Sequence, residues 1–141
     1  MIVVPAVGDA IPPFVVESVD PQRMKTMAAI LRDPYPIHWD RTAVASMGLG
    51  ERTVNQGPLN LGYIANMLMA WGGDNSIRRL TVQFHARVFD GDRVVAGGVV
   101  DAVAATDEGW DATCSVWLKR ASQTMVSGTA HVWHRRMGDV R

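Results

Sequence analysis

Asp33 and His38 are the residues whose types and spacing best suit chemistry. They lie in the stretch RDPYPIHWD at residues 32–40, which also contains Pro34 and Pro36. Proline fixes its own φ and pushes the residue before it into an extended conformation, so this stretch cannot form a regular helix and must be a stiff turn. A stiff turn can hold a carboxylate and an imidazole around one small molecule. Because histidine titrates near neutrality, such a pair is suited to activating water beside a carbonyl group.

Both residues also have purely structural interpretations, and their spacing alone leaves these open. Asp33 can cap the turn, and His38 can be a hydrogen-bonded histidine of the core. Other reactive side chains are weaker candidates. His131 and His134 are three residues apart in an expected strand, so they point to opposite faces and do not form a metal site. Cys114 falls among alternating apolar positions and is expected to be a core thiol rather than a nucleophile.

The bulk composition predicts one globular domain over residues 1–141. The chain has 14 Lys and Arg against 14 Asp and Glu, and this balance argues against a nucleic acid or a membrane surface as a partner. Its single cysteine excludes an intramolecular disulfide and fits a reducing compartment. The N-terminal stretch MIVVPAVGDAIPP has no basic leader, and no apolar run reaches the roughly 18 to 20 residues of a membrane span. We therefore expect a soluble cytoplasmic protein.

Three helices are predicted in the first half of the chain. Asp20 is a suitable N-cap and Pro21 suits the first helical position, so one helix precedes the proline-rich turn. A second, short helix is expected between a cap at Asp40 and a stop at Gly48. The third covers residues 57–73 and is apolar nearly all round, which is the pattern of a buried helix.

Most of the remaining chain has the patterns of strands joined by short turns. Residues 14–19 predict a short strand, and the alternation of apolar and polar residues over 80–88 predicts a long one. Further strands are expected at 93–106, where Gly97 and Gly98 allow a bulge or a strong bend, and at 110–120 and 125–135. An antiparallel sheet that curves around one buried helix satisfies this order, which is the hotdog architecture of the α+β class. Since such a sheet has an exposed edge, we expect a dimer that continues it.

Four segments resemble the MaoC-like hydratase/dehydratase family, also called the (R)-specific enoyl hydratases. YPIHWD is similar to the NPIHWD-type signature of that family, with Asp33, Pro36, Ile37 and His38 in register. The resemblance covers most of the chain and implies the same hotdog fold. The other segments are VGDAIPP at 7–13, similar to the opening of the family, NQGPLNLGYIANMLMAW at 55–71, similar to the start of its central helix, and LTVQFHARVFDGDRV at 80–94, similar to its VRF…PVFPGD strand and turn.

This resemblance implies reversible, stereospecific hydration of a 2-enoyl thioester to a (3R)-3-hydroxyacyl thioester, carried by CoA or an acyl-carrier protein. Asp33 and His38 would be the catalytic residues that hold the water and move its protons, with the assignment of acid and base left open. The backbone N–H of Gly57, at the positive end of the central helix, would stabilise the charge that develops on the thioester oxygen. Gln56 and Tyr35 would complete the oxyanion and substrate-binding site. The resemblance implies no metal and no cofactor.

Departures from the family pattern keep other functions open. Tyr35 replaces an asparagine of the family, and Gln56 stands where many members have histidine. The helix at 57–73 also resembles that of the small chain of heteromeric steroid side-chain hydratases, so a heterodimer with a second hotdog chain is as consistent as a homodimer. Two further alternatives are a hotdog acyl thioesterase and a helper subunit that completes the pocket of another chain.

Overall fold

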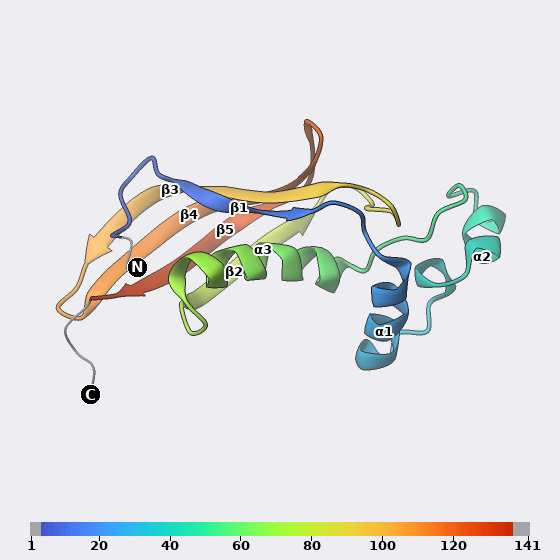
Figure 1. Cartoon of the computed structure of the whole chain (residues 1–141), viewed down its shortest axis with the longest axis horizontal. Coiled ribbons are helices and arrows are strands. Elements are labelled where there is room, and N and C mark those ends of the chain that lie inside the picture. Colours follow the sequence, from blue (N-terminus) through green and yellow to red (C-terminus); the bar gives the residue numbers. More distant parts are fainter. Residues whose placement is uncertain (1–3, 137–141) are drawn as a thin grey trace.

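The computed structural model describes residues 4–136, and the first three residues of the N-terminal stretch discussed above lie outside this range. Residues 4–136 form five strands and three α-helices, with one 3₁₀ turn, η1, between the first two helices (Figure 1). The elements in chain order are β1 (Ala10–Val16), α1 (Pro21–Leu31), η1 (Pro36–His38), α2 (Arg41–Ser46), α3 (Gly57–Gly72), β2 (Ile77–Phe84), β3 (Val94–Ala105), β4 (Gly109–Arg120) and β5 (Gln123–Arg135).

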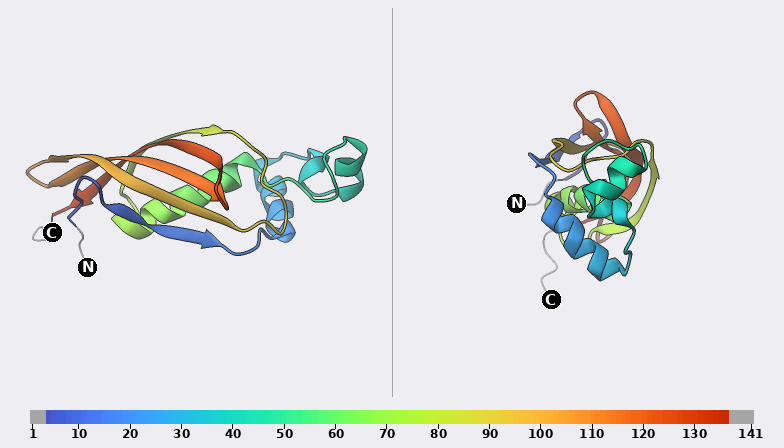
Figure 2. Two further views of the ribbon diagram at one scale, coloured as in Figure 1. Left: turned by 90° about the horizontal axis from the view of Figure 1, so that it is seen from above. Right: turned by 90° about the vertical axis from the view of Figure 1, so that its right-hand side faces the viewer.

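The strands form one antiparallel sheet in the order β1-β3-β4-β5-β2, with β1 and β2 at its edges. The sheet lies along one side of α3, whereas α1, η1 and α2 project beyond one end of the sheet (Figures 1 and 2). The predicted α+β class and the antiparallel sheet along one central helix are therefore confirmed. No helix among residues 4–136 is long and apolar enough to cross a membrane.

The core lies between α3 and the inner face of the sheet. The expected core position of Cys114 is confirmed, because Ala112, Cys114, Val116 and Leu118, which alternate along β4, are all buried. The expectation that α3 is buried all round is wrong for this single chain. The buried residues of α3 are Asn60, Ile64, Met67 and Leu68, whereas the opposite side of the helix includes the half-buried Leu61, Ala65 and Met69 and the exposed Asn66.

The first strand begins earlier than its sequence suggested, at Ala10 rather than at residue 14, and ends at Val16. It includes Pro12 and Pro13, which lack an N–H group and are therefore unsuited to a central strand. Both fit here because β1 is an edge strand that pairs only with β3, and because its register shifts between Ile11 and Phe14, on either side of the prolines.

The strand predicted over 80–88 instead covers Ile77–Phe84. It ends there because the N–H groups of His85 and Ala86 both donate to the carbonyl of Met125, which takes the chain out of the regular ladder. Phe84 is 54% exposed, although it continues the apolar side of β2.

The two glycines of β3 do not lie at a bulge, which was one of the two possibilities that they allowed. The register shift in β3 lies between Val100 and Ala102. A Cβ atom on Gly97 would come within 2.6 Å of the Trp117 indole nitrogen, and one on Gly98 within 2.9 Å of the Ile11 side chain. These glycines therefore make room for side chains that lie across the sheet.

Candidate active site

The end of helix α1 fixes the direction in which Asp33 leaves it. Arg32 is in the left-handed region, with φ 52°, and its N–H donates to the carbonyls of Ala28 and Ala29. The N–H of Asp33 donates back to the carbonyl of Ala28. The Asp33 carboxylate then accepts a 3.2 Å hydrogen bond from the N–H of Tyr35. Asp33 therefore caps the turn, as its structural interpretation in the sequence predicted.

His38 is held on the opposite side of the same turn. It ends η1, where its N–H donates to the carbonyl of Tyr35, and its side chain is only 10% exposed. Its ring atom Nδ1 lies 2.7 Å from the carbonyl oxygen of Val54. Since a carbonyl oxygen can only accept, Nδ1 carries the proton, and the neutral ring has its lone pair on Nε2.

The two side chains meet at the surface of the protein. Nε2 of His38 lies 3.7 Å from Oδ2 of Asp33, and the Asp33 side chain is 44% exposed. This distance is longer than a direct hydrogen bond, so an oxygen atom beside the pair can lie within hydrogen-bonding distance of both groups. The ring of Tyr35 stands edge-on to the imidazole, with the ring centroids 6.1 Å apart. The predicted convergence of Asp33 and His38 is therefore present in the structure.

The segment before α3 carries both the partner of His38 and the start of the helix. Val54 forms an antiparallel bridge with Phe89, and its N–H donates to the carbonyl of Ile37. The N–H of Asn55 donates to the carbonyl of Val88. These bonds fix the chain from Val54 to Gly57, where α3 begins.

Gly57 opens helix α3 with a free backbone donor. Gln56 is the N-cap, and its carbonyl accepts from the N–H groups of Leu59 and Asn60. None of the residues described by the structure accepts a hydrogen bond from the N–H of Gly57, and Pro58 has no N–H to donate. A Cβ atom at Gly57 would lie 3.2 Å from the Phe84 ring. The start of α3 therefore combines a free donor with little space for a side chain.

Comparison with known proteins places this arrangement in a family. Residues 8–116 match the MaoC-like domain. The chain belongs to the MaoC-like domain family. No curated protein matches its sequence.

Solved structures confirm the hotdog fold of this MaoC-like chain. The (R)-hydratase from A. caviae involved in PHA biosynthesis has a TM-score of 0.80 and 23% identity, over 92% of this chain and 96% of that one. The R-hydratase PhaJ1 from Pseudomonas aeruginosa has a TM-score of 0.79 and 16% identity, over 96% and 90%. The ChsH1–ChsH2 complex from Mycobacterium tuberculosis has a TM-score of 0.75 and 21% identity, over 92% and 98%.

The remaining candidates of the MaoC-like site differ in their surroundings. Gln56 is 1% exposed, and its amide nitrogen donates to the carbonyl of Met24 at 2.8 Å, which ties α1 to the start of α3. Its amide oxygen has no hydrogen-bond partner among the described residues. Tyr35 is exposed, and its hydroxyl lies 3.9 Å from the sulfur of Met47. Gln56 is thus interior to the protein, whereas Tyr35 lies at its surface.

Sequence reasoning missed residues that support the site through the main chain. The role of Val54 depends on its carbonyl oxygen, which leaves no signal in the residue type. Asn55 donates from its amide to the side-chain oxygens of Asn60 and Tyr63, at 2.8 and 3.2 Å. Burial of the Tyr63 ring raises the pKa of its hydroxyl, an effect that the hydrogen bond from Asn55 partly offsets. Asn55 and Asn60, two polar residues near the start of an otherwise apolar helix, were the sequence signal that could have indicated this network.

The other reactive side chains lie in structural surroundings. Burial, with a smaller contribution from Asp101, raises the pKa of the Cys114 thiol to about 11, so it is a core thiol as expected. His134 is buried against the ring of Trp71, with centroids 4.2 Å apart, whereas His131 is exposed. In residues 4–136, no three His, Cys, Asp or Glu side chains are placed to hold a metal ion.

Proposed function

We propose that this MaoC-like protein is a hydratase or dehydratase that interconverts a 2-enoyl thioester and a (3R)-3-hydroxyacyl thioester of CoA or an acyl-carrier protein. The observation that carries the proposal is the fixed imidazole. The Val54 carbonyl holds the proton on Nδ1 of His38, so that Nε2 faces the Asp33 carboxylate at 3.7 Å. Two groups that can accept and return protons then border one exposed point of the surface.

In the hydration direction, a water molecule held between Asp33 and His38 adds its oxygen to C3 of the enoyl group. One O–H bond of the water breaks, its proton passes to the Asp33–His38 pair, and a proton from the pair goes to C2. The overall reaction adds H and OH across the double bond and leaves the pair as it began. Dehydration is the same path in reverse, and the two residues act as a coupled pair.

Negative charge develops on the thioester oxygen during this addition, and we propose that Gly57 stabilises it. The free N–H of Gly57 at the start of α3 supports this role, since helix N-termini combine unpaired donors with a positive dipole end. Tyr35, exposed beside the imidazole, would contact the substrate. Gln56 would contribute indirectly, because its hydrogen bond to α1 holds the adjacent Gly57 backbone in place.

We also propose that the working protein is a homodimer or a heterodimer with a second hotdog chain. Strand β2 is an open edge of the sheet, and the outer side of α3 is only half covered. The segment that projects beyond the sheet also carries exposed apolar side chains, among them Ile30, Leu31, Tyr35, Trp39 and Met47. The similarity to the ChsH1–ChsH2 complex, which is named as an assembly of two chains, supports the heteromeric form.

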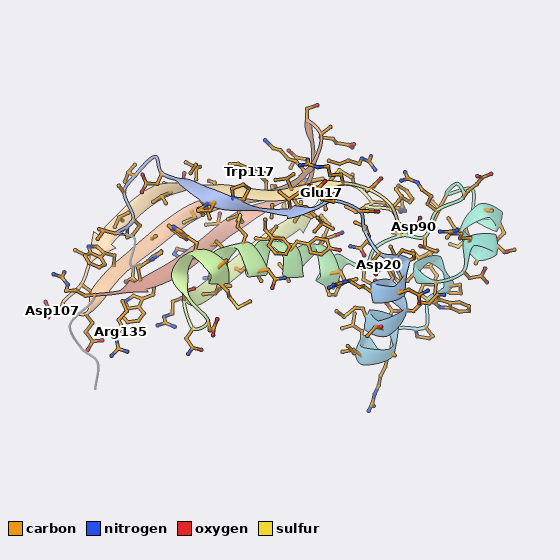
Figure 3. The ribbon with its side chains drawn as sticks, in the orientation of Figure 1. Glu17, Asp20, Asp90, Asp107, Trp117 and Arg135 are labelled. Atoms are coloured by element: carbon orange, nitrogen blue, oxygen red, sulfur yellow. The ribbon has the colours of Figure 1, made fainter. Side chains whose placement is uncertain are left out.

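The test is ultraviolet absorbance of crotonyl-CoA and of a longer 2-enoyl-CoA, with wild type beside Asp33→Asn and His38→Ala. General acid–base groups typically contribute about 10²- to 10⁴-fold, so both variants should lose hydration while remaining folded. Asp107→Asn and His131→Ala are the matched controls, since both residues are exposed and Asp107 lies at the opposite end of the molecule from Asp20 and Asp90 (Figure 3).

Two outcomes would contradict the proposal. A wild-type protein that neither hydrates nor dehydrates any enoyl or hydroxyacyl thioester, alone or with a second hotdog chain, would exclude the activity. Release of free thiol, followed with a colorimetric thiol reagent at the same rate as loss of substrate, would indicate the thioesterase alternative instead.

A further inference from the structure

Asp90 is a buried carboxylate that the proposed reaction does not use. It lies between β2 and β3, at the end of the sheet from which α1 and α2 project (Figure 3), and it is only 6% exposed. Its Oδ2 atom accepts hydrogen bonds from both the N–H and the hydroxyl of Thr53, at 2.7 and 2.6 Å. Its Oδ1 atom lies 3.4 Å from the guanidinium of Arg41 in α2. A buried carboxylate needs such partners, and bonds to an ionised acceptor are the strong ones.

The backbone of Asp90 also binds Thr53. Its N–H donates to the carbonyl of Thr53 at 2.9 Å, so Asp90 binds the N–H, the hydroxyl and the carbonyl of Thr53. The next residue is Val54, which accepts from Nδ1 of His38 at 2.7 Å. An unbroken series of bonded and adjacent residues therefore runs from Asp90 through Thr53 and Val54 to His38.

We propose that Asp90 is a positioning residue for His38. By fixing Thr53, it aims the Val54 carbonyl at Nδ1 and so keeps the imidazole in the tautomer whose lone pair, on Nε2, faces Asp33. The consequence for catalysis rests on the proposed hydratase function, whereas the consequence for the tautomer does not.

A purely structural role for Asp90 makes a different prediction. Arg41 contacts the carboxylate from α2, so loss of Asp90 would loosen α2 and lower the melting temperature in either case. Only the positioning role also predicts a change in which ring nitrogen of His38 carries the proton. The test must therefore measure the tautomer of the His38 ring directly, in addition to activity and stability.

The experiment compares wild type with Asp90→Ala and Asp90→Asn by long-range ¹H–¹⁵N NMR of the histidine rings, with His38→Ala to assign the signals. We expect the Nδ1–H form of His38 in wild type and a raised population of the Nε2–H form in Asp90→Ala. We expect kcat on an enoyl-CoA to fall roughly 10- to 100-fold with little change in KM, as for a misplaced catalytic group. Asp90→Asn keeps an oxygen acceptor for Thr53 and should restore most of both properties.

Thr53→Val provides a second variant in case Asp90→Ala does not fold. It removes only the hydroxyl bond to Asp90, so a smaller shift in the same direction is expected, with Thr53→Ser as its control. A His38 ring pattern identical to wild type in folded Asp90→Ala, or in Thr53→Val, would overturn the proposal. Absence of hydratase activity in wild type would instead remove the proposed function, and the ring nitrogens would still decide the role of Asp90.

Discussion

His38 and Val54 are 16 residues apart in the chain, yet Nδ1 of one lies 2.7 Å from the carbonyl oxygen of the other. The N–H of Val54 in turn donates to the carbonyl of Ile37, the residue before His38. These two bonds fasten η1 to the segment that leads into α3. One contact thus sets the tautomer of the neutral imidazole, and it also links the Asp33–His38 turn to the start of the central helix.

We predict that Asp33 and His38 act as one unit in hydration. The single variants Asp33→Asn and His38→Ala should each lower kcat by about 10²- to 10⁴-fold, and the double variant should cost little more than the worse single one. The reason is that each residue needs the other to hold and deprotonate the same water. Steady-state rates of enoyl-CoA hydration for the four proteins measure the coupling. Losses that multiply in the double variant would show that the two residues act independently.

We predict that Gly57→Ala lowers hydration through the ring of Phe84. The added methyl group would lie 3.2 Å from that ring, so either the ring or the start of α3 must shift. A shift of the helix start moves the N–H proposed to face the thioester oxygen, and loss of one such donor costs about 10²- to 10³-fold in kcat. Phe84→Ala in the same chain should recover part of the activity, because it removes the obstacle. Failure of that recovery would show that the Gly57 backbone itself is altered.

Gly62→Ala is the control for this prediction. Gly62 lies in the middle of α3, and a Cβ atom there would meet no atom of the described residues within 4 Å. Alanine in place of a mid-helix glycine should raise the unfolding free energy by about 0.5 to 1 kcal/mol with unchanged kcat. Chemical denaturation measures the change. A loss of stability instead would show that another chain packs closely against this side of α3.

The elements that position the site could be predicted because their signals are local. Asp20 and Asp40 cap their helices through side-chain bonds to backbone N–H groups within three residues. The period of two in β4 placed Cys114 in the core, and the resemblance in YPIHWD placed Asp33 beside His38. Each of these inferences needed only neighbouring residues or a shared motif.

What the sequence did not indicate depends on contacts between distant segments. Nothing local in the sequence shows that Thr53 and Arg41 approach Asp90. The exposure of Phe84 has a similar origin, since β2 ends where the chain bonds to Met125 instead of continuing the ladder. Hydrogen bonds of the backbone carry no residue signature, so only the assembled fold reveals them.

We predict that Asp92 stabilises the fold at neutral pH and loses this effect in acid. Burial would raise its pKa, but the N–H of Phe89 and the guanidinium groups of Arg120 and Arg52 outweigh it and lower the pKa below its usual range. A lowered pKa means stability that is present above the unfolded value, about 3.9, and lost as pH falls through the folded value. Asp92→Asn should therefore lower the unfolding free energy at pH 7 by roughly 1 to 3 kcal/mol, with a difference from wild type that shrinks below about pH 4.

Urea denaturation at several pH values measures this difference. Asp107→Asn is the matched control, because Asp107 is exposed in the turn between β3 and β4 and its substitution should change stability by less than about 0.5 kcal/mol. If the difference in unfolding free energy between wild type and Asp92→Asn stays constant down to pH 3, the Asp92 carboxylate contributes through its shape rather than its charge.

We predict that His134 makes the fold less stable as pH falls below neutrality. Burial lowers its pKa, and its Nε2 atom has no hydrogen-bond partner among the described residues. Between the unfolded pKa, about 6.5, and the lowered folded value, the unfolded chain binds a proton that the folded protein does not, so unfolding becomes more favourable as pH decreases. His134→Phe keeps an aromatic ring against Trp71 but cannot titrate. Relative to wild type, it should therefore gain unfolding free energy steadily below about pH 6.5 and keep a constant difference above about pH 7.5. His131→Gln removes an exposed histidine and should follow the wild-type pH curve; parallel curves for His134→Phe and wild type would mean that His134 titrates alike in both states.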